Sequence, residues 1–151
     1  MPSNFNDSMI MSVEEQYKVK EKYYNEAIRY MDNAGEYLKN AQKEGNYYGD
    51  PKYVRTACGT AYSGLLIALD GYCILKGIHT SNSKKERKSI EYYQNNIAKQ
   101  DKKMLVQLNL AYQILHIFGY YDGTQSVKVV KEGFNIANAI IEKIKPLTHK
   151  E

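Results

Sequence analysis

The sequence predicts an all-α protein, an antiparallel up-and-down bundle of four longer helices and one short helix. Three observations support this prediction. Apolar residues recur at helical spacing in five segments, no segment alternates like a half-buried strand, and mostly short connections carry glycine, proline or capping residues. We expect one helical-bundle domain at residues 12–146, between a disordered N-terminal segment at 1–11 and a flexible tail at 147–151.

The first helix is expected at residues 13–43. Ser12 and Glu15 have the spacing of a capping box, in which each side chain bonds the other residue's backbone N–H. Apolar or small residues then recur at helical spacing: Tyr17, Tyr24, Ala27, Ile28, Met31, Ala34, Leu38 and Ala41. Charged residues occupy the other positions, so this helix is expected to be amphipathic.

A second helix is expected at residues 51–76, after a loop at 44–50. Asp50 suits the N-cap, Pro51 the first helical position and Gly77 the stop. The helix has a broad apolar face and many small residues. Each interior glycine costs about 1 kcal/mol relative to alanine, which predicts tight helix contact or a nearby ligand. These glycines are Gly59, Gly64 and Gly71.

Three further helices follow a polar, basic connection at residues 78–88. Their expected N-caps are polar residues that can accept a hydrogen bond from the first turn: Ser89, Asp101 and Ser126. The first of these helices is short, the second is expected to end at Gly119, and the last stops before Pro146. Residues 121–124 form a turn between the last two.

The composition is that of an ordinary globular domain, with 151 residues, 43% hydrophobic and 25% charged. A net charge of +4 does not by itself indicate a nucleic-acid partner. The first residues lack the basic and apolar regions of a secretory signal. The longest strongly apolar run, Leu65–Leu69, is far too short for a membrane span. We therefore expect a cytoplasmic protein without membrane association.

The two cysteines lie on one predicted helix. Cys58 and Cys73 are about 22 Å apart along its axis, so they cannot form a disulfide within one chain. Buried thiols in a chain without a signal agree with a reducing cytoplasm. The simplest interpretation is that both are small core residues.

Tyrosine dominates the aromatic content, with 15 Tyr, 3 Phe and no Trp. Four pairs are adjacent in sequence: Tyr23–Tyr24, Tyr47–Tyr48, Tyr92–Tyr93 and Tyr120–Tyr121. On a helix, one ring of each pair can pack while the other lies at the rim with its hydroxyl in water. One interpretation is that Tyr replaces Phe and Trp at half-buried positions. The other is a tyrosine-rich contact surface, since Tyr is common at interfaces.

Asp70 interrupts the apolar run of the second helix, and a buried carboxylate must be paired, hydrogen-bonded or neutral. One hypothesis is a polar site in the bundle core, with Asp70, Tyr62, Arg55 and His116 as candidate residues. The alternative is that Asp70 lies at the edge of the apolar face and pairs with a neighbouring base. The candidate partners are Arg29, Arg55, His116 and tyrosine hydroxyls.

Other chemical motifs are sparse. The basic cluster that could bind phosphate, or could be a solvated loop, consists of Lys84, Lys85, Arg87 and Lys88. No His, Cys, Asp or Glu pair has the spacing of a metal site, and there is no phosphate-binding loop or nucleophile motif. We therefore expect no metal, no cofactor and no catalytic residue.

The second predicted helix carries, in order, Arg55, Ala61-Tyr62, Ser63-Gly64, Ala68-Leu69 and Leu75-Lys76-Gly77. This pattern resembles the central helix of HEPN-type helical bundles and, more narrowly, that of a small bacterial family of unknown function with this kind of bundle. The resemblance covers residues 14–145. The stretch 115–122 resembles a late helix end with its turn, and Ala137 and Ile141 match an amphipathic last helix. The resemblance implies a bundle that often dimerises and acts as a binding or accessory module, sometimes beside nucleotidyltransferases.

The chain departs from the ribonuclease members of that superfamily, which carry an Arg shortly before a His in a late helix. The positions before His116 that would hold the arginine are Asn109, Leu110, Ala111 and Tyr112, and no Arg follows Arg87. We therefore predict a non-enzymatic interaction module that forms a homodimer through tyrosine-rich and small-residue helix faces. The alternatives are a nucleic-acid or nucleotide-binding accessory protein and, ranked last, an enzyme with a site around Asp70.

Overall fold

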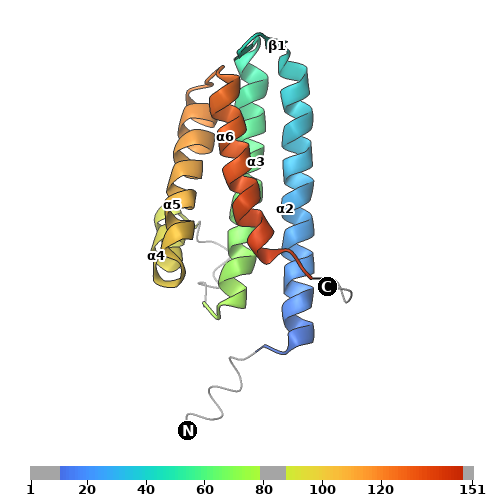
Figure 1. Cartoon of the computed structure of the whole chain (residues 1–151), viewed down its shortest axis with the longest axis vertical. Helices are drawn as coiled ribbons and strands as arrows, with labels where there is room; N and C mark the ends of the chain where they lie inside the picture. The colour runs from blue at the N-terminus through green and yellow to red at the C-terminus, as the bar shows by residue number, and fades with distance from the viewer. Residues whose placement is uncertain (1–10, 79–87, 148–151) are drawn as a thin grey trace.

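The computed structural model describes residues 11–78 and 88–147. The elements are α2 (Val13–Ala41), β1 (Lys43–Glu44), β2 (Tyr47–Tyr48), α3 (Pro51–Leu75), α4 (Ile90–Gln100), α5 (Lys102–Ala111), the π-helix η1 (Tyr112–Tyr121), α6 (Val127–Ile141) and the 3₁₀ turn η2 (Glu142–Ile144). Successive long helices run in opposite directions (Figure 1). The all-α prediction is therefore confirmed. The expected disordered segment and tail lie almost wholly outside the described residues.

The helix starts agree closely with the sequence. Side-chain oxygens accept first-turn backbone N–H groups at each predicted N-cap: Ser12, Asp50, Ser89, Asp101 and Ser126. Ser12 and Glu15 bond reciprocally, as a capping box requires. Gly77 follows α3 with φ of +71°, a left-handed conformation that glycine adopts without strain. These local signals therefore placed every long helix within a few residues.

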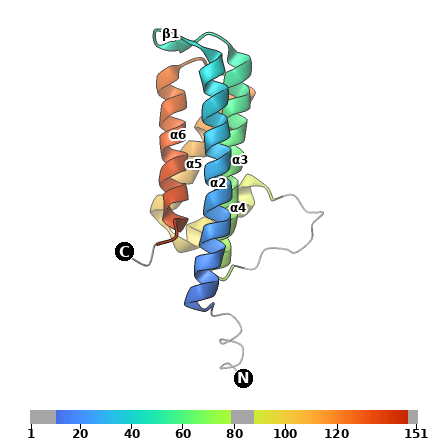
Figure 2. The same ribbon diagram turned by 90° about the vertical axis from the view of Figure 1, so that its right-hand side faces the viewer.

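Helix α3 is the centre of the bundle. It packs against α2 along its length and also against η1 and α6, whereas α2 and α6 touch each other little (Figure 2). Its buried side is formed by apolar and small residues, among them Val54, Cys58, Leu65 and Leu69. By length and composition, α3 could also cross a membrane. The core helix of a soluble protein meets the same criteria, and half of the most apolar stretch of α3 is buried inside this structure.

The interior glycines of α3 confirm the predicted close packing. A Cβ on Gly64 would lie 3.0 Å from the Cβ of Tyr30, and one on Gly71 would lie 2.6 Å from the Cβ of Tyr23. Both tyrosines belong to α2. Real Cβ atoms essentially never approach as closely as at Gly71 and seldom as closely as at Gly64, so glycine is what allows α2 to pack so near to α3.

The loop expected at residues 44–50 contains a small hairpin instead, and α2 ends at Ala41 rather than at residue 43. Strands β1 and β2 pair antiparallel through a two-residue turn. Gly45 is the first turn residue and has φ of +66°, the position where a type II′ hairpin turn favours glycine. Two-residue strands are too short to show an alternating pattern, so no strand could be predicted here.

The helix expected to end at Gly119 continues through Tyr121, because its second half widens into the π-helix η1. A Cβ on Gly119 would overlap both Cβ and Sγ of Cys58 on α3. Gly119 is therefore a packing position and not a helix stop. Long π-helices are rare and are frequently associated with functional sites.

Substituting Gly119 with Ala should lower the free energy of unfolding by about 1–3 kcal/mol, because the added methyl group overlaps Cys58. Gly35→Ala on α2 is the matched control, since nothing lies within 4 Å of the added Cβ there. The control should raise stability by about 0.5–1 kcal/mol through helix propensity. Urea denaturation followed by circular dichroism measures both, and equal effects would contradict the packing role of Gly119.

Candidate functional site

A pocket of about 570 Å³ opens between α2, α3 and η1. Its lining residues are Tyr30, Thr56, Gly59, Thr60, Tyr62, Ser63, His116, Tyr120 and Tyr121. Two of the four residues predicted for a polar site, Tyr62 and His116, therefore meet here. Within the part of the chain that the structure describes, no Lys, Arg, Asp or Glu lines this pocket.

His116 is at the centre of a cluster of aromatic rings. Tyr112 and Tyr120, four residues before and after it on η1, stack on it with centroid distances of 5.3 and 5.8 Å. Tyr62 of α3 lies 4.7 Å from it, and Tyr121 approaches edge-on at 4.9 Å. Burial lowers the pKa of His116, so the imidazole is neutral at pH 7.

Three hydroxyl groups of α3 also line the pocket. Each donates its proton to the carbonyl four residues earlier: Thr56 to Lys52, Thr60 to Thr56, and Ser63 to Gly59, at 3.1, 2.8 and 3.1 Å. A hydroxyl has one proton and two lone pairs. With the protons used inside the helix, these groups offer hydrogen-bond acceptors to the pocket.

Arg55, the third predicted site residue, closes the end of η1 beside the pocket. Its guanidinium donates to the backbone carbonyls of Tyr120, Tyr121 and Asp122. The last carbonyls of a helix lack intrahelical partners and carry a partial negative charge, which a cation satisfies. Arg55 therefore caps the C-terminal end of η1. The same hydrogen bonds hold the backbone of Tyr120 and Tyr121, which line the pocket.

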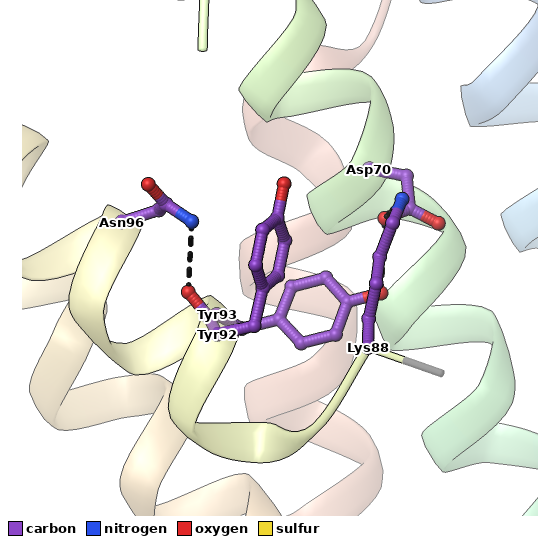
Figure 3. A network of polar contacts seen from close by, with 5 residues as sticks. All are labelled: Asp70, Lys88, Tyr92, Tyr93 and Asn96. Carbon is purple, nitrogen blue, oxygen red and sulfur yellow. Dashed lines mark hydrogen bonds and ion pairs between the residues drawn. The ribbon is translucent and has the colours of Figure 1, made fainter. Parts of the chain in front are cut away.

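Asp70, the fourth predicted residue, lies eight residues beyond Tyr62 on α3, about 12 Å further along the axis. Figure 3 shows the ring of Tyr93 reaching from α4 to Asp70, with Lys88 beside it. Lys88 Nζ and Tyr93 Oη lie 3.0 and 2.9 Å from Asp70 Oδ1. The alternative interpretation, an edge position paired with a base, describes this geometry.

The three bases proposed as partners of Asp70 were wrong, whereas the proposed tyrosine hydroxyl is confirmed by Tyr93. Arg29 forms a bidentate pair with Glu26, Arg55 caps η1, and His116 lies among tyrosine rings. The sequence could not identify Lys88 as the partner, because Lys88 is 18 residues from Asp70 and precedes a different helix, α4. Burial alone would lower the pKa of Lys88, but the hydrogen bond and charge of Asp70 outweigh it and raise that pKa.

The predicted basic patch is only partly described. Lys84, Lys85 and Arg87 lie outside the described residues, and Lys88 is bound to Asp70. No three His, Cys, Asp or Glu side chains in the described ranges could together hold a metal ion. Cys58 and Cys73 are buried and unpaired, and burial raises their thiol pKa to about 12 and about 11. Such thiols are poor nucleophiles and metal ligands.

A second surface lies on α5 and η1. Nine large hydrophobic side chains are exposed among the described residues, and five of them lie between Val106 and Tyr121. We define the α5 face as Val106, Leu110 and Phe118, which are 65%, 43% and 40% exposed. They belong to one row of every fourth residue, whose remaining member, Ile114, packs against Gly133 of α6.

Sequence reasoning missed most of the pocket. Tyr30, Thr60, Ser63, Tyr120 and Tyr121 were not among the candidate site residues. Two patterns could have indicated them. Thr56, Thr60 and Ser63 follow helical spacing opposite the apolar face, and the aromatic residues at 112, 116 and 120 recur every fourth position.

These features define an all-α helical-bundle protein with an aromatic pocket beside its central helix. The chain belongs to a family described as "Domain of unknown function (DUF5618)", which matches residues 22–146. A solved protein of unknown function from Dyadobacter fermentans is similar, with 40% identity over 82% of this chain and 94% of that chain, and a TM-score of 0.73. No curated protein matches. A family of unknown function was expected, and the HEPN-like resemblance stays a prediction.

Tyr93→Phe should lower the free energy of unfolding by about 1–2 kcal/mol, because it removes a hydrogen bond to the Asp70 carboxylate. Tyr92→Phe is the matched control. The Tyr92 hydroxyl is buried and has no partner among the described residues, so its removal should be neutral or stabilising. Combining Tyr93→Phe with Asp70→Asn in a double-mutant cycle should give a non-zero coupling energy. Strict additivity would contradict the interaction.

The His116 cluster should make stability fall with acidification. The unfolded chain binds a proton near pH 6.5, whereas the folded pKa of His116 is lower. Between these two values the unfolded state holds more protons, so the free energy of unfolding decreases as pH falls. His116→Gln should remove this part of the pH dependence. Denaturation midpoints of both proteins from pH 8 to about pH 5 measure it, and parallel curves would contradict it.

Proposed function

We propose that this protein is a non-enzymatic, HEPN-like interaction module of the cytoplasm that forms a homodimer through the α5 face. The main support is the exposure of Val106, Leu110 and Phe118 on a segment without charge. From Met104 to Tyr121 the chain contains no Lys, Arg, Asp or Glu. Exposed apolar side chains that gather on one face of a helix are typical of a protein interaction site.

A second copy of the chain is the occupant that the chemistry favours. In a two-fold dimer the same patch lies on both sides of the interface. A face without charges suffers no like-charge repulsion when it meets itself. Figure 1 places α5 beside α6 and on the other side of the bundle from α2, where a partner could approach it. This location replaces the tyrosine-rich and small-residue faces expected from the sequence, because Gly64 and Gly71 are already covered by α2 within the same chain.

The non-enzymatic part of the proposal is supported by the separation of the candidate polar residues. Asp70 is bonded to Lys88 and Tyr93. It lies about two turns of α3 beyond Tyr62, which lines the pocket with His116. The nucleic-acid alternative receives no specific support from the described residues, because Lys88 is held by Asp70.

Val106→Lys should weaken the dimer by at least about a hundredfold in dissociation constant, because two ammonium groups would be desolvated at a symmetric interface. Sedimentation velocity over a micromolar concentration series measures the change. The wild-type chain should shift from monomer to dimer with rising concentration, and the variant should remain monomeric.

Val13→Lys is the control, because Val13 is 84% exposed and belongs to α2 rather than to the α5 face. It should dimerise like the wild-type chain. A wild-type chain that is strictly monomeric throughout the series would overturn the proposed homodimer, and equal loss in both variants would overturn the assignment to the α5 face.

A further inference from the structure

We propose that the pocket between α2, α3 and η1 binds a small aromatic amine, a flat ring that carries a protonated amino group. This binding site is separate from the α5 face and does not depend on dimerisation. Its volume of about 570 Å³ lies within the range of small-molecule sites, and it combines aromatic walls with a few converging polar groups.

The aromatic side of the pocket suits a flat ring and a cation. Tyr30, Tyr62, Tyr120 and Tyr121 contribute rings from three different helices. The faces of aromatic rings carry partial negative charge, so they attract ammonium groups and also stack with other rings. His116 adds no opposing charge, because burial keeps its imidazole neutral.

The hydroxyl side supplies acceptors for an ammonium group. The oxygens of Thr56, Thr60 and Ser63 have their protons committed to helix carbonyls and retain lone pairs. An ammonium group has three N–H donors and no acceptor, which matches this wall. Uncharged acceptors also allow the cation to enter without an existing ion pair being broken.

An anionic ligand finds no cationic partner in the same pocket. Among the described residues no Lys or Arg side chain lines it, so its side-chain donors are neutral, namely the tyrosine hydroxyls and the N–H of His116. Its α3 and η1 walls are helical backbone whose N–H groups are bonded internally. The nearby guanidinium of Arg55 is used by the carbonyls at the end of η1, and Arg29 is held by Glu26. Burial of a carboxylate or phosphate here would therefore be unfavourable.

Isothermal titration calorimetry with two probes of one shape tests the proposal. Tryptamine carries an indole ring and an ammonium group, whereas indole-3-propionate has the same ring with a carboxylate on the same two-carbon chain. Tryptamine should bind saturably with a dissociation constant of about 1 mM or tighter. Indole-3-propionate should bind at least about tenfold more weakly. Absence of tryptamine binding, or equal binding of the two probes, would overturn the proposal.

Substitutions inside and outside the pocket test whether tryptamine binds there. Tyr120→Ala removes an exposed ring of the pocket and should weaken tryptamine binding about fivefold to tenfold. Tyr37→Ala, a similarly exposed tyrosine of α2 outside the pocket, should bind like the wild-type chain. The double variant Thr60→Val, Ser63→Ala removes two acceptors with little change of shape and should weaken binding about tenfold.

Each variant is first checked for an unchanged circular dichroism spectrum and melting transition, so that a lost fold is not mistaken for lost binding. Val106→Lys should bind tryptamine as well as the wild-type chain does, which separates this site from the dimer. Equal weakening by Tyr120→Ala and Tyr37→Ala would overturn the assignment of the pocket.

Discussion

Close contact between α3 and its neighbours is the constraint on which the rest of the structure depends. Gly64 and Gly71 allow α2 to lie against the α3 backbone, and Gly119 allows η1 to lie against Cys58. Each glycine loses helix propensity, and the dense packing of the interface offsets that loss. The same approach of three helices brings aromatic rings and hydroxyl groups together at the pocket. The pocket is thus a consequence of how small residues are distributed along α3.

Charged groups are placed where the fold can satisfy them without desolvating them fully. Among the described residues, no charged side chain is fully buried. Arg55 lies at the open end of η1, and the half-buried Asp70 and Lys88 lie at the boundary between α3 and α4. Ionised groups in such positions gain a partner and keep contact with water, which is less costly than complete burial. Both arrangements join segments that are distant in sequence.

The uncharged segment from Met104 to Tyr121 carries two different surfaces. One side of it holds the stacked row of Tyr112, His116 and Tyr120 against α3. Another side leaves Val106, Leu110 and Phe118 exposed, whereas Ile114 of the same row is buried. In both rows the members are four residues apart, and the wide π turns of η1 extend the rows past the end of α5. One stretch of sequence therefore contributes to the pocket and to the proposed dimer face.

Local sequence signals are enough to place the helices and their starts, because capping, proline, glycine and apolar spacing act within a few residues. They also identify Gly64 and Gly71 as packing positions and Asp70 as a residue that needs a partner. Tertiary contacts alone select Lys88 and Tyr93 as the partners of Asp70 and bring Tyr62 and His116 to one pocket. They also decide that η1 widens past Gly119. These outcomes depend on contacts between residues far apart in the chain, which no local periodicity encodes.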